Sequence, residues 1–298
     1  MQIAWSVRRE TLPLDDTSGA AWLMLPPEAR AGFDRLTRAG VPLAEAGLGT
    51  ATLGVKCGCN EAFLIDAVSC NGRVEVSDGT RSSLIERQFV RPVLRGESVR
   101  RWRAEREAEC IVFPYSNGGR LLPTLSPALR SWLLPWRGRL EARTDLRGER
   151  AWWSLFRLEG SRCDRPRVVW ADLGRSLQAM VLDAGDRMVP LNTCYVLPTR
   201  DLADALALAA LLNSPVIDAW VGAIAEPARG NYRRHFAWTM ARVPVPDDWA
   251  RARDVLGALG EAAMRGEPPS PADLMQATLE AFRVRARTMA PLVEWING

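Results

Sequence analysis

The apolar residues of this chain are dispersed in short stretches, and this dispersion limits its fold more than any other feature. The longest apolar runs, such as residues 205–212, fall well short of the roughly 20 residues that a membrane-spanning helix needs. Hydrophobic residues still make up 47% of the 298 residues, which is enough to bury a sizeable core. We therefore expect a globular chain of one large domain or two small ones, with no membrane partner.

The cysteines and the N-terminus predict a reducing compartment. The chain has six cysteines, and its first ten residues lack the apolar stretch of a secretory signal peptide. Without a secretory signal, cysteines usually remain reduced thiols in the cytosol, so we expect a cytoplasmic location. Cys57 and Cys59 resemble half of a zinc site, but no second cysteine pair follows at zinc spacing. We expect the cysteines to act as small buried hydrophobic side chains.

Several catalytic motifs require residue types that this chain almost lacks. Lys56 is the only lysine, and because Cys57 follows it, a Walker-type phosphate loop is excluded. Gly54 stands two places before this lysine, which excludes the Asp/Glu-x-Lys core of metal-dependent nucleases. His235 is the only histidine, so histidine-rich zinc sites are excluded, and its arginine neighbours should lower its basicity. We expect His235 to lie at the surface or to contact a phosphate.

Positive charge is concentrated in two stretches. The net charge of the chain is +4, but residues 86–150 carry +6 and residues 229–242 carry +4. Of the 39 basic residues, 38 are arginine, the side chain suited to bidentate bonds with phosphate and guanine. A GC-rich genome would produce the same bias. Each stretch could present an anion-binding face.

Hydrophobic periodicity and turn residues predict an α+β fold with a mixed, antiparallel-rich sheet, packed helices and a helical C-terminal tail. Helices are expected at residues 26–39, at 126–143 with a break at Pro135, at 201–213 as an amphipathic helix, at 215–225, and over much of 247–298, with a start signal at Ser270. Strands are expected at residues 62–68, 110–113, 167–170, 177–182, 193–197 and 236–243, with hairpin turns within 69–79. We divide the chain into a lead-in and helix (1–39), a recognition domain (40–246) and a helical extension (247–298).

Residues 54–63 form a glycine-hinged loop that leads into a strand. The glycines let backbone N–H groups approach a partner closely, while Lys56 and Asn60 supply polar contacts. Composition alone favours a structural β-turn here. The loop is similar, however, to the Gly-x-x-Thr-Gly-x-Asn-x-Ala-Phe loop of the target-recognition (TaqI-like C-terminal specificity) domain of N6-adenine DNA methyltransferases and Type IIG restriction enzymes. The matching residues are Gly54, Gly58, Asn60, Ala62 and Phe63, and Cys57 stands where the family usually has Thr.

Five further segments resemble blocks of the same family, in the same order. These segments are residues 92–102, 111–115, 167–172, 211–215 and 228–234. Within the first of them, Ser98 replaces the usual Asp. The resemblance therefore extends over residues 40–246, the span assigned to the recognition domain.

The catalytic half of that family has no counterpart in the sequence. In that family an Asn/Asp-Pro-Pro-Tyr/Phe motif holds the flipped adenine. The nearest match to this motif is residues 25–28, which lack both the amide and the aromatic ring. The resemblance implies duplex DNA recognition for a bacterial restriction-modification or phage-defence complex, with S-adenosylmethionine bound by a partner methyltransferase subunit or a missing domain and no cofactor in this chain. Two alternatives remain: an assembly subunit that kept the fold without reading DNA, and an unrecognised enzyme that uses acids such as Asp172.

The charge pattern and the resemblance together identify candidate DNA contacts. In the first basic stretch, Glu97, Glu105 and Glu107 accompany the arginines, so a solvated, salt-bridged helix face is the alternative interpretation. In the second stretch no acidic residue falls between positions 229 and 242, which favours phosphate contacts. The candidate residues are Lys56, Asn60, Arg95, Arg100, Arg101, Arg103, Arg229, Tyr232, Arg233 and Arg234, and Arg91 and Arg106 extend the first cluster.

No catalytic residue and no metal ligand is expected in this chain. The tryptophans of the apolar segments are expected in the core rather than on a base-stacking surface. These tryptophans are Trp132, Trp136, Trp152 and Trp153.

Overall fold

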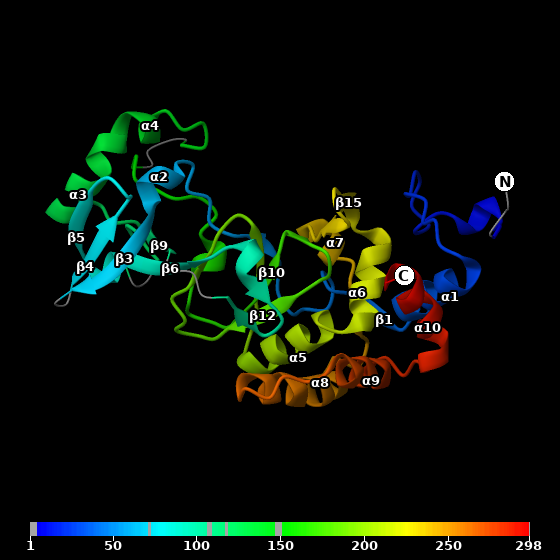
Figure 1. The fold of residues 1–298 in the computed structure, drawn as a ribbon. Coiled ribbons are helices and arrows are strands. Elements are labelled where there is room, and N and C mark those ends of the chain that lie inside the picture. The colour runs from blue at the N-terminus through cyan, green and yellow to red at the C-terminus, as the bar shows by residue number, and fades with distance from the viewer. Residues whose placement is uncertain (1–4, 71–72, 106–108, 117–118, 147–150, 298) are drawn as a thin grey trace.

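The structure, a computed structural model, describes residues 5–70, 73–105, 109–116, 119–146 and 151–297 (Figure 1). It has the predicted α+β fold, with mixed helices, antiparallel-rich sheets and a helical C-terminal tail. A sheet with short helices forms one end of the elongated molecule, and a group of longer helices forms the other end, where both termini lie beside α1 and α10.

The first hydrophobic core lies against a sheet whose order among the described residues is β13–β6–β9–β3–β4–β5. Its strands are β3 (Leu64–Cys70), β4 (Arg73–Ser77), β5 (Ser82–Glu86), β6 (Val90–Leu94), β9 (Glu109–Val112) and β13 (Val189–Pro190). All neighbours pair antiparallel except β13 and β6. Helices α3 (Pro127–Leu133) and α4 (Arg137–Glu141) border this core, and the chain breaks between them around Pro135 as predicted, because proline lacks the N–H that continues a helix.

The second core lies against a sheet ordered β12–β10–β14–β2 in the described chain, with every pair antiparallel. Its strands are β2 (Thr52–Leu53), β10 (Arg167–Ala171), β12 (Ala179–Leu182) and β14 (Cys194–Pro198). Helix α5 (Leu202–Leu212) packs against β10 and β12 on one side and against α8 (Trp249–Met264) on the other. Consequently every residue of α5 from Asp204 onward is buried, and the prediction that this helix is amphipathic was wrong.

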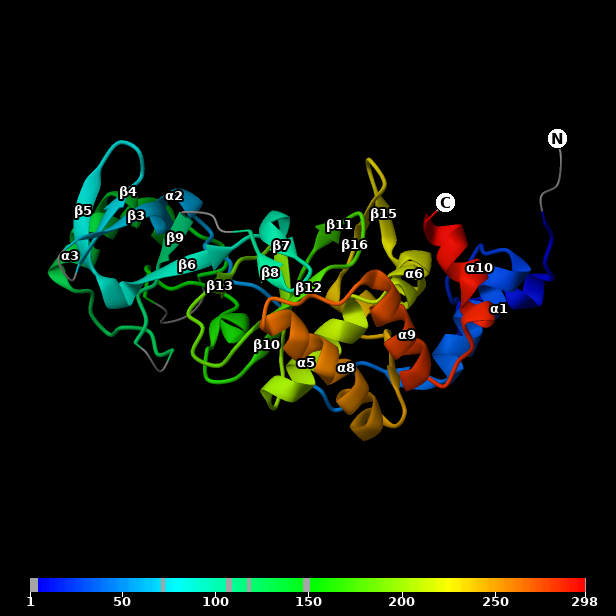
Figure 2. The same cartoon turned by 60° about the horizontal axis from the view of Figure 1, so that its bottom comes forward.

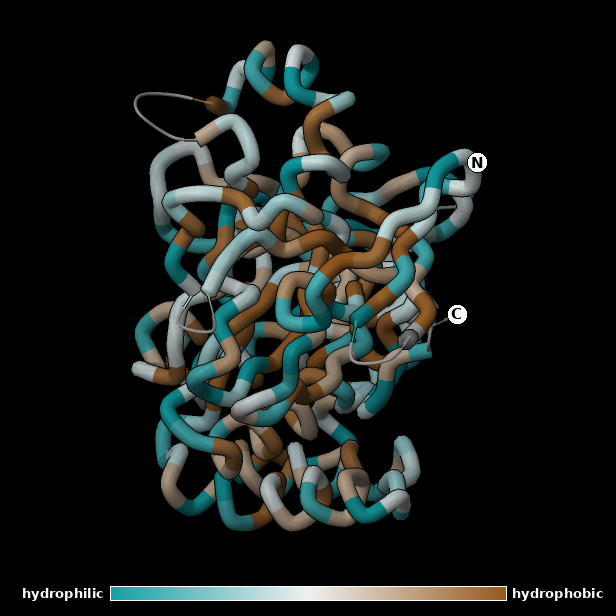
Figure 3. The backbone as a smooth tube through the Cα atoms, turned by 90° about the vertical axis from the view of Figure 1, so that its left-hand side faces the viewer, coloured by the Kyte–Doolittle hydropathy of each residue, from teal (hydrophilic) through white to brown (hydrophobic). Residues whose placement is uncertain are grey.

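The remaining helices complete the second core and bring distant parts of the chain together. They are α1 (Pro27–Arg38), α6 (Pro215–Ile224), α9 (Pro271–Ala281) and α10 (Ala286–Asn297). The predicted start of α9 is confirmed, because Ser270 and Asp273 form a reciprocal capping box. Helix α10 packs against both α1 and α6, so apolar side chains from the lead-in, the middle and the tail share one interior. Figure 3 shows hydrophobic positions of the backbone gathered toward the middle of the molecule. The three-domain division of the sequence stays a prediction.

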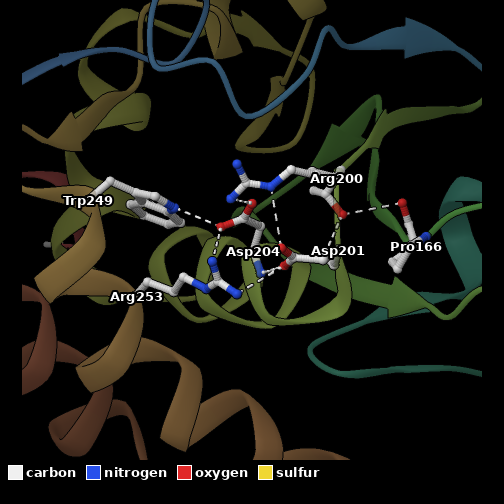
Figure 4. Close-up of polar contacts among 7 residues, drawn as sticks. Pro166, Arg200, Asp201, Asp204, Trp249 and Arg253 are labelled. Atoms are coloured by element: carbon white, nitrogen blue, oxygen red, sulfur yellow. Dashed lines mark hydrogen bonds and ion pairs between the residues drawn. The ribbon is translucent and has the colours of Figure 1, made fainter.

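A buried carboxylate attaches the tail to α5 (Figure 4). The Asp204 side chain is 3% exposed, and its Oδ1 accepts a hydrogen bond from Trp249 Nε1 at 3.0 Å and lies 3.6 Å from Arg253 Nη1. Its Oδ2 lies 3.2 Å from Arg200 Nη2. Because Trp249 and Arg253 belong to α8, this network holds the first turns of the tail against the second core.

Short strands form smaller sheets around the two cores. They are β1 (Gly40–Pro42) with β17 (Pro244–Pro246), β7 (Val99–Arg100) with β8 (Arg103–Ala104), and the order β11 (Leu173–Gly174), β16 (Tyr232–Arg234), β15 (Glu226–Ala228). The strand predicted at residues 236–243 was wrong, since this segment contains the helix α7 (Ala237–Met240). The Met240 N–H donates to the Phe236 carbonyl at 2.9 Å and the Ala241 N–H donates to the Ala237 carbonyl at 2.8 Å, which is the i→i−4 pattern of an α-helix.

Within the described ranges, no single helix is long and apolar enough to cross a membrane. Helices α5 and α6 pass that test as a pair, by length and composition only, although the pair is bent by 69° between them.

Candidate nucleic-acid interface

The most prominent basic element is the β15–β16 hairpin, which projects from the molecule in Figure 2. Its register pairs Ala228 with Tyr232, so residues 229–231 form the tip. Gly230 and Asn231 have φ angles of 77° and 62°, the left-handed values that glycine and asparagine accept most easily. All three tip residues are exposed. The predicted contact Arg229 therefore stands at the outermost point of this hairpin.

Strand alternation separates the two neighbouring arginines of β16. Arg233 is directed toward α6 and α10, where its Nη2 donates to the Ile296 carbonyl at 3.2 Å. Its guanidinium also fills the space beside Gly222, since a Cβ at that glycine would lie 2.6 Å from Nη1. Arg233 thus contributes to the helical core, and its contact with DNA stays a prediction.

Arg234 has an acidic partner that the local sequence did not reveal. Its Nη1 lies 3.0 Å from Asp172 Oδ2, and its guanidinium lies 5.5 Å from the centre of the Phe236 ring. Burial raises the pKa of the Asp172 carboxyl, and the positive charge of Arg234 opposes that rise. Asp172 directly follows β10. It supplies a counter-ion to Arg234 from another part of the chain, although no acidic residue falls between positions 229 and 242.

Tyr232 brings a further basic residue to the hairpin. The residue is 37% exposed, and the Arg175 guanidinium lies 5.3 Å from the centre of its ring. Arg175 is exposed and follows β11, which pairs with β16. Sequence reasoning missed Arg175 because it lies between the two basic stretches. It also missed Trp238, 57% exposed on α7, because that segment was assigned to a strand.

Within the first basic stretch, residues 99–104 form a hairpin and not a helix. Strands β7 and β8 are joined at Arg101 and Trp102, and the φ of Trp102 is 72°. This left-handed conformation is stabilised by a hydrogen bond from the Trp102 N–H to the Ala179 carbonyl at 3.0 Å and by packing against the second core. The alternative of a salt-bridged helix face was therefore wrong about the helix, because two strands occupy these residues.

Acidic neighbours do neutralise two of the predicted arginines. Arg95 forms a bidentate ion pair with Glu109, at 2.7 and 2.8 Å, and Arg100 does the same with Glu105, at 2.9 and 2.6 Å. Arg103 is exposed and has no carboxylate partner among the described residues. Arg91 is buried, and its guanidinium donates to the carbonyls of Arg187 and Ser161. Arg106 and Glu107 lie outside the described residues.

Asp218 belongs to α6 and lies close enough to both basic hairpins for their charges to act on it. Burial raises the pKa of its carboxyl, and the positive charges of Arg101 and Arg233 act in the opposite direction. Its Oδ1 accepts a hydrogen bond from the Leu177 N–H at 2.7 Å. Because Arg101 belongs to the first hairpin and Arg233 to the second, the fold brings the two basic stretches to one neighbourhood, which the sequence could not show.

Close packing against neighbouring backbone shapes the glycine-hinged loop (residues 54–63). A Cβ at Gly54 would lie 2.1 Å from the Leu191 carbonyl oxygen, and Gly58 has a φ of 70°. Lys56 is exposed, pairs with Asp145 at 2.5 Å, and exchanges two backbone hydrogen bonds with Phe156 at 3.0 Å. Asn60 is exposed in α2 (Asn60–Phe63).

His235 and three of the described cysteines are buried. The prediction that His235 lies at the surface or contacts a phosphate was wrong, because the residue is 2% exposed and burial lowers its pKa to about 4. Cys57, Cys59 and Cys194 are buried as predicted, whereas Cys110 and Cys163 are half-buried, and the side chain of Cys70 lies outside the description. Burial raises the pKa of the Cys57 thiol to about 12. No cluster of metal-ligating side chains occurs among the described residues.

The tryptophans predicted to be in the core pack against the first core. Trp132 is 2% exposed, and its Nε1 donates to the Ala62 carbonyl at 3.1 Å. Trp136, Trp152 and Trp153 are half-buried at the edge of the same core.

Two of the elements that carry candidate residues lie on one side of the molecule. In both ribbon views α2 and β15 are on the upper side, while α5 and α8 are on the lower side. Figure 2 places the β7–β8 hairpin and β11 between α2 and β15. Asn60 belongs to α2, Arg103 to β8 and Arg229 to the tip of the β15–β16 hairpin, and Lys56 precedes α2 in the chain.

Comparison with known proteins finds similarity to a Type II methyltransferase and to two restriction enzymes. No family model matches the sequence. Over 254 residues, 84% of this chain, the sequence is 27% identical to Type II methyltransferase M.PaeR7I from Pseudomonas aeruginosa. The fold is similar to that of the Type IIL restriction-modification enzyme MmeI, solved in complex with DNA, with a TM-score of 0.50, 10% identity and coverage of 86% of this chain and 36% of that one. It is also similar to the type IIG restriction endonuclease BpuSI, with a TM-score of 0.50, 11% identity and coverage of 92% and 34%. The chain spans 41% of the length of M.PaeR7I, so its similarity is to a part of a Type II methyltransferase.

Proposed function

We propose that this chain recognises a specific sequence in double-stranded DNA for an adenine-N6 methyltransferase of a restriction-modification or phage-defence complex. The observation that carries the proposal is the placement of α2 and the basic β15–β16 hairpin on one side of the molecule, with the basic β7–β8 hairpin between them in Figure 2, in a fold similar to that of MmeI and BpuSI. S-adenosylmethionine and the methyl-transfer residues belong to a partner subunit or another domain in this proposal.

The charge of this side suits a duplex backbone. Arg103 and Arg229 are exposed without a carboxylate partner among the described residues, and Arg175 lies over the Tyr232 ring. Such groups attract phosphates and release the condensed counterions of DNA. Phosphate contacts alone fix position but carry no sequence information, so base contacts from the same side must supply the specificity.

Binding of the purified chain to duplex DNA tests this proposal. A pool of random duplexes is bound over several rounds of selection, and the retained sequences are determined. We expect the retained sequences to share a short motif. We also expect the affinity for that motif to fall steeply between 50 and 200 mM salt. Over this range, proteins that contact about six to ten phosphates lose roughly 10³ to 10⁵ in affinity. Retained sequences without any shared motif would contradict the proposal.

A second candidate is a non-catalytic assembly subunit that kept the fold but does not read DNA. The internal ion pairs of Arg95 with Glu109 and of Arg100 with Glu105 favour it, because they neutralise two of the predicted DNA contacts. In that case the chain would co-purify with a methyltransferase but would not bind duplex DNA.

A further inference from the structure

The tip of the β15–β16 hairpin exposes two side chains that suit base recognition. Arg229 and Asn231 are exposed, and neither forms an ion pair or a side-chain hydrogen bond within the described parts of the chain. Glycine would accept the left-handed φ of 62° at position 231 more easily than asparagine. Asparagine adds an amide there that can donate and accept hydrogen bonds at once.

The base of the hairpin is held firmly, while its tip is unconstrained. Strand β16 pairs with β15 on one side and with β11 on the other. Arg234 is fixed by Asp172 at 3.0 Å, and Arg233 by the Ile296 carbonyl at 3.2 Å. The ring of Tyr232 lies beside the tip, 3.7 Å from the place of a Cβ at Gly230. The contacts that hold a ribbon in one orientation are therefore present at its base.

We propose that this hairpin enters the major groove of DNA and that Arg229 and Asn231 read base edges. The inference rests on the proposed function and assigns the residues that determine its specificity. The major groove, about 12 Å wide, admits a two-stranded β-ribbon. An arginine there makes a bidentate contact with O6 and N7 of guanine, and an asparagine with N6 and N7 of adenine. Arg103, in the neighbouring β7–β8 hairpin, contacts phosphates beside the groove.

The chemistry of the tip suits base reading. Arg229 supplies a charged fork that matches a guanine edge, and Asn231 adds an uncharged amide that can donate and accept at an adenine edge at once. Arg234 and Arg233, which carry charge, are held by Asp172 and by the Ile296 carbonyl at the base of the hairpin. The two side chains left at the tip are therefore a guanine-reading type and an adenine-reading type.

Selection from random duplexes with matched variants tests the inference. The variants are Arg229→Ala, Asn231→Gly, which retains the left-handed backbone, and Asn231→Asp as a second replacement. Arg265→Ala is the control, because Arg265 is exposed directly after α8 and belongs to neither of the basic hairpins. We expect each tip variant to lose discrimination at one or two positions of the wild-type motif and to bind that site about 5- to 150-fold more weakly, the range of one bidentate base contact. Binding to a scrambled duplex should change less than about threefold.

The other outcomes overturn the inference in distinguishable ways. If the variants select the same motif with unchanged affinity, the hairpin does not read bases, while the motif of the wild type still supports the proposed function. An equal loss on selected and scrambled duplexes would assign the tip to phosphates and overturn base reading alone. If the wild-type chain selects no motif, the proposed function itself fails. Unchanged melting temperatures of the variants establish that binding, and not folding, is measured.

Discussion

The side-chain amide of Asn213 forms a reciprocal pair of hydrogen bonds with the backbone of Ala179. The Ala179 N–H donates to Asn213 Oδ1 at 2.8 Å, and Asn213 Nδ2 donates to the Ala179 carbonyl at 2.9 Å. The amide thus imitates a neighbouring strand at the edge of β12. The same carbonyl accepts the N–H of Trp102, so this pair also positions the β7–β8 hairpin. Asn213 lies in one of the segments that resemble the methyltransferase family, and its role here is architectural.

Replacing Asn213 with Ala should therefore destabilise the protein. The substitution removes two buried hydrogen bonds and leaves a buried N–H without its acceptor, which costs about 2 to 4 kcal/mol of unfolding free energy. Urea denaturation followed by circular dichroism measures the change. A loss below about 0.5 kcal/mol would mean that water replaces the amide.

Asn60, which is exposed in α2, provides the contrasting case. We expect Asn60→Ala to leave the melting temperature nearly unchanged, because exposed side chains contribute little to stability. The same variant should bind a selected duplex several-fold more weakly, since one hydrogen bond to DNA is lost. Fluorescence anisotropy with labelled duplex measures the affinity. Unfolding of the variant would instead make this loop a purely structural turn.

Arg103→Ala should change the salt dependence of DNA binding. Each phosphate contact contributes about 0.9 to the slope of log affinity against log salt concentration. Loss of this exposed arginine should flatten the slope by about one unit on specific and nonspecific duplexes alike. Arg287→Ala, at an exposed arginine of α10, serves as the control. An unchanged slope would mean that the β7–β8 hairpin faces protein and not DNA.

His235 should make the protein less stable in acid. Burial lowers its pKa in the folded chain from 6.5 to about 4, so the unfolded chain binds a proton that the folded chain refuses between these values. The resulting loss of unfolding free energy is absent above pH 6.5. It increases as the pH falls and reaches about 3 kcal/mol at about pH 4. Urea denaturation at pH 7 and pH 4.5, compared with His235→Asn, measures this contribution. Equal pH dependence in both proteins would show that His235 is not its source.

Asp204→Ala should weaken the attachment of the tail. Removing this buried carboxylate leaves the guanidinium of Arg253 and the indole N–H of Trp249 without their shared acceptor atom. We expect a loss of about 3 kcal/mol in unfolding free energy, as for other buried ion pairs that lose one partner. Asp254→Ala, at an exposed aspartate of α8, is the control and should change stability by less than about 0.5 kcal/mol. Equal effects of the two substitutions would contradict this role of Asp204.

Local sequence signals determined much of the secondary structure. The Ser270 cap, the break at Pro135 and the boundaries of α5 and α6 were predictable, because capping, the missing proline N–H and turn residues act within a few positions along the chain. The arginine-rich stretches also followed from local sequence, and the Gly-Asn pair at the hairpin tip suits its left-handed turn.

Tertiary structure alone decided which charges remain available. Asp172 neutralises Arg234 from 62 positions away, and Arg233 turns toward the carbonyl of Ile296, because strand pairing and alternation bring distant residues together. The same long-range packing buried His235, surrounded α5 on all sides and made a helix of residues 237–240. These features depend on contacts between residues far apart in the chain, and local patterns of hydrophobicity and charge contain no information about such contacts.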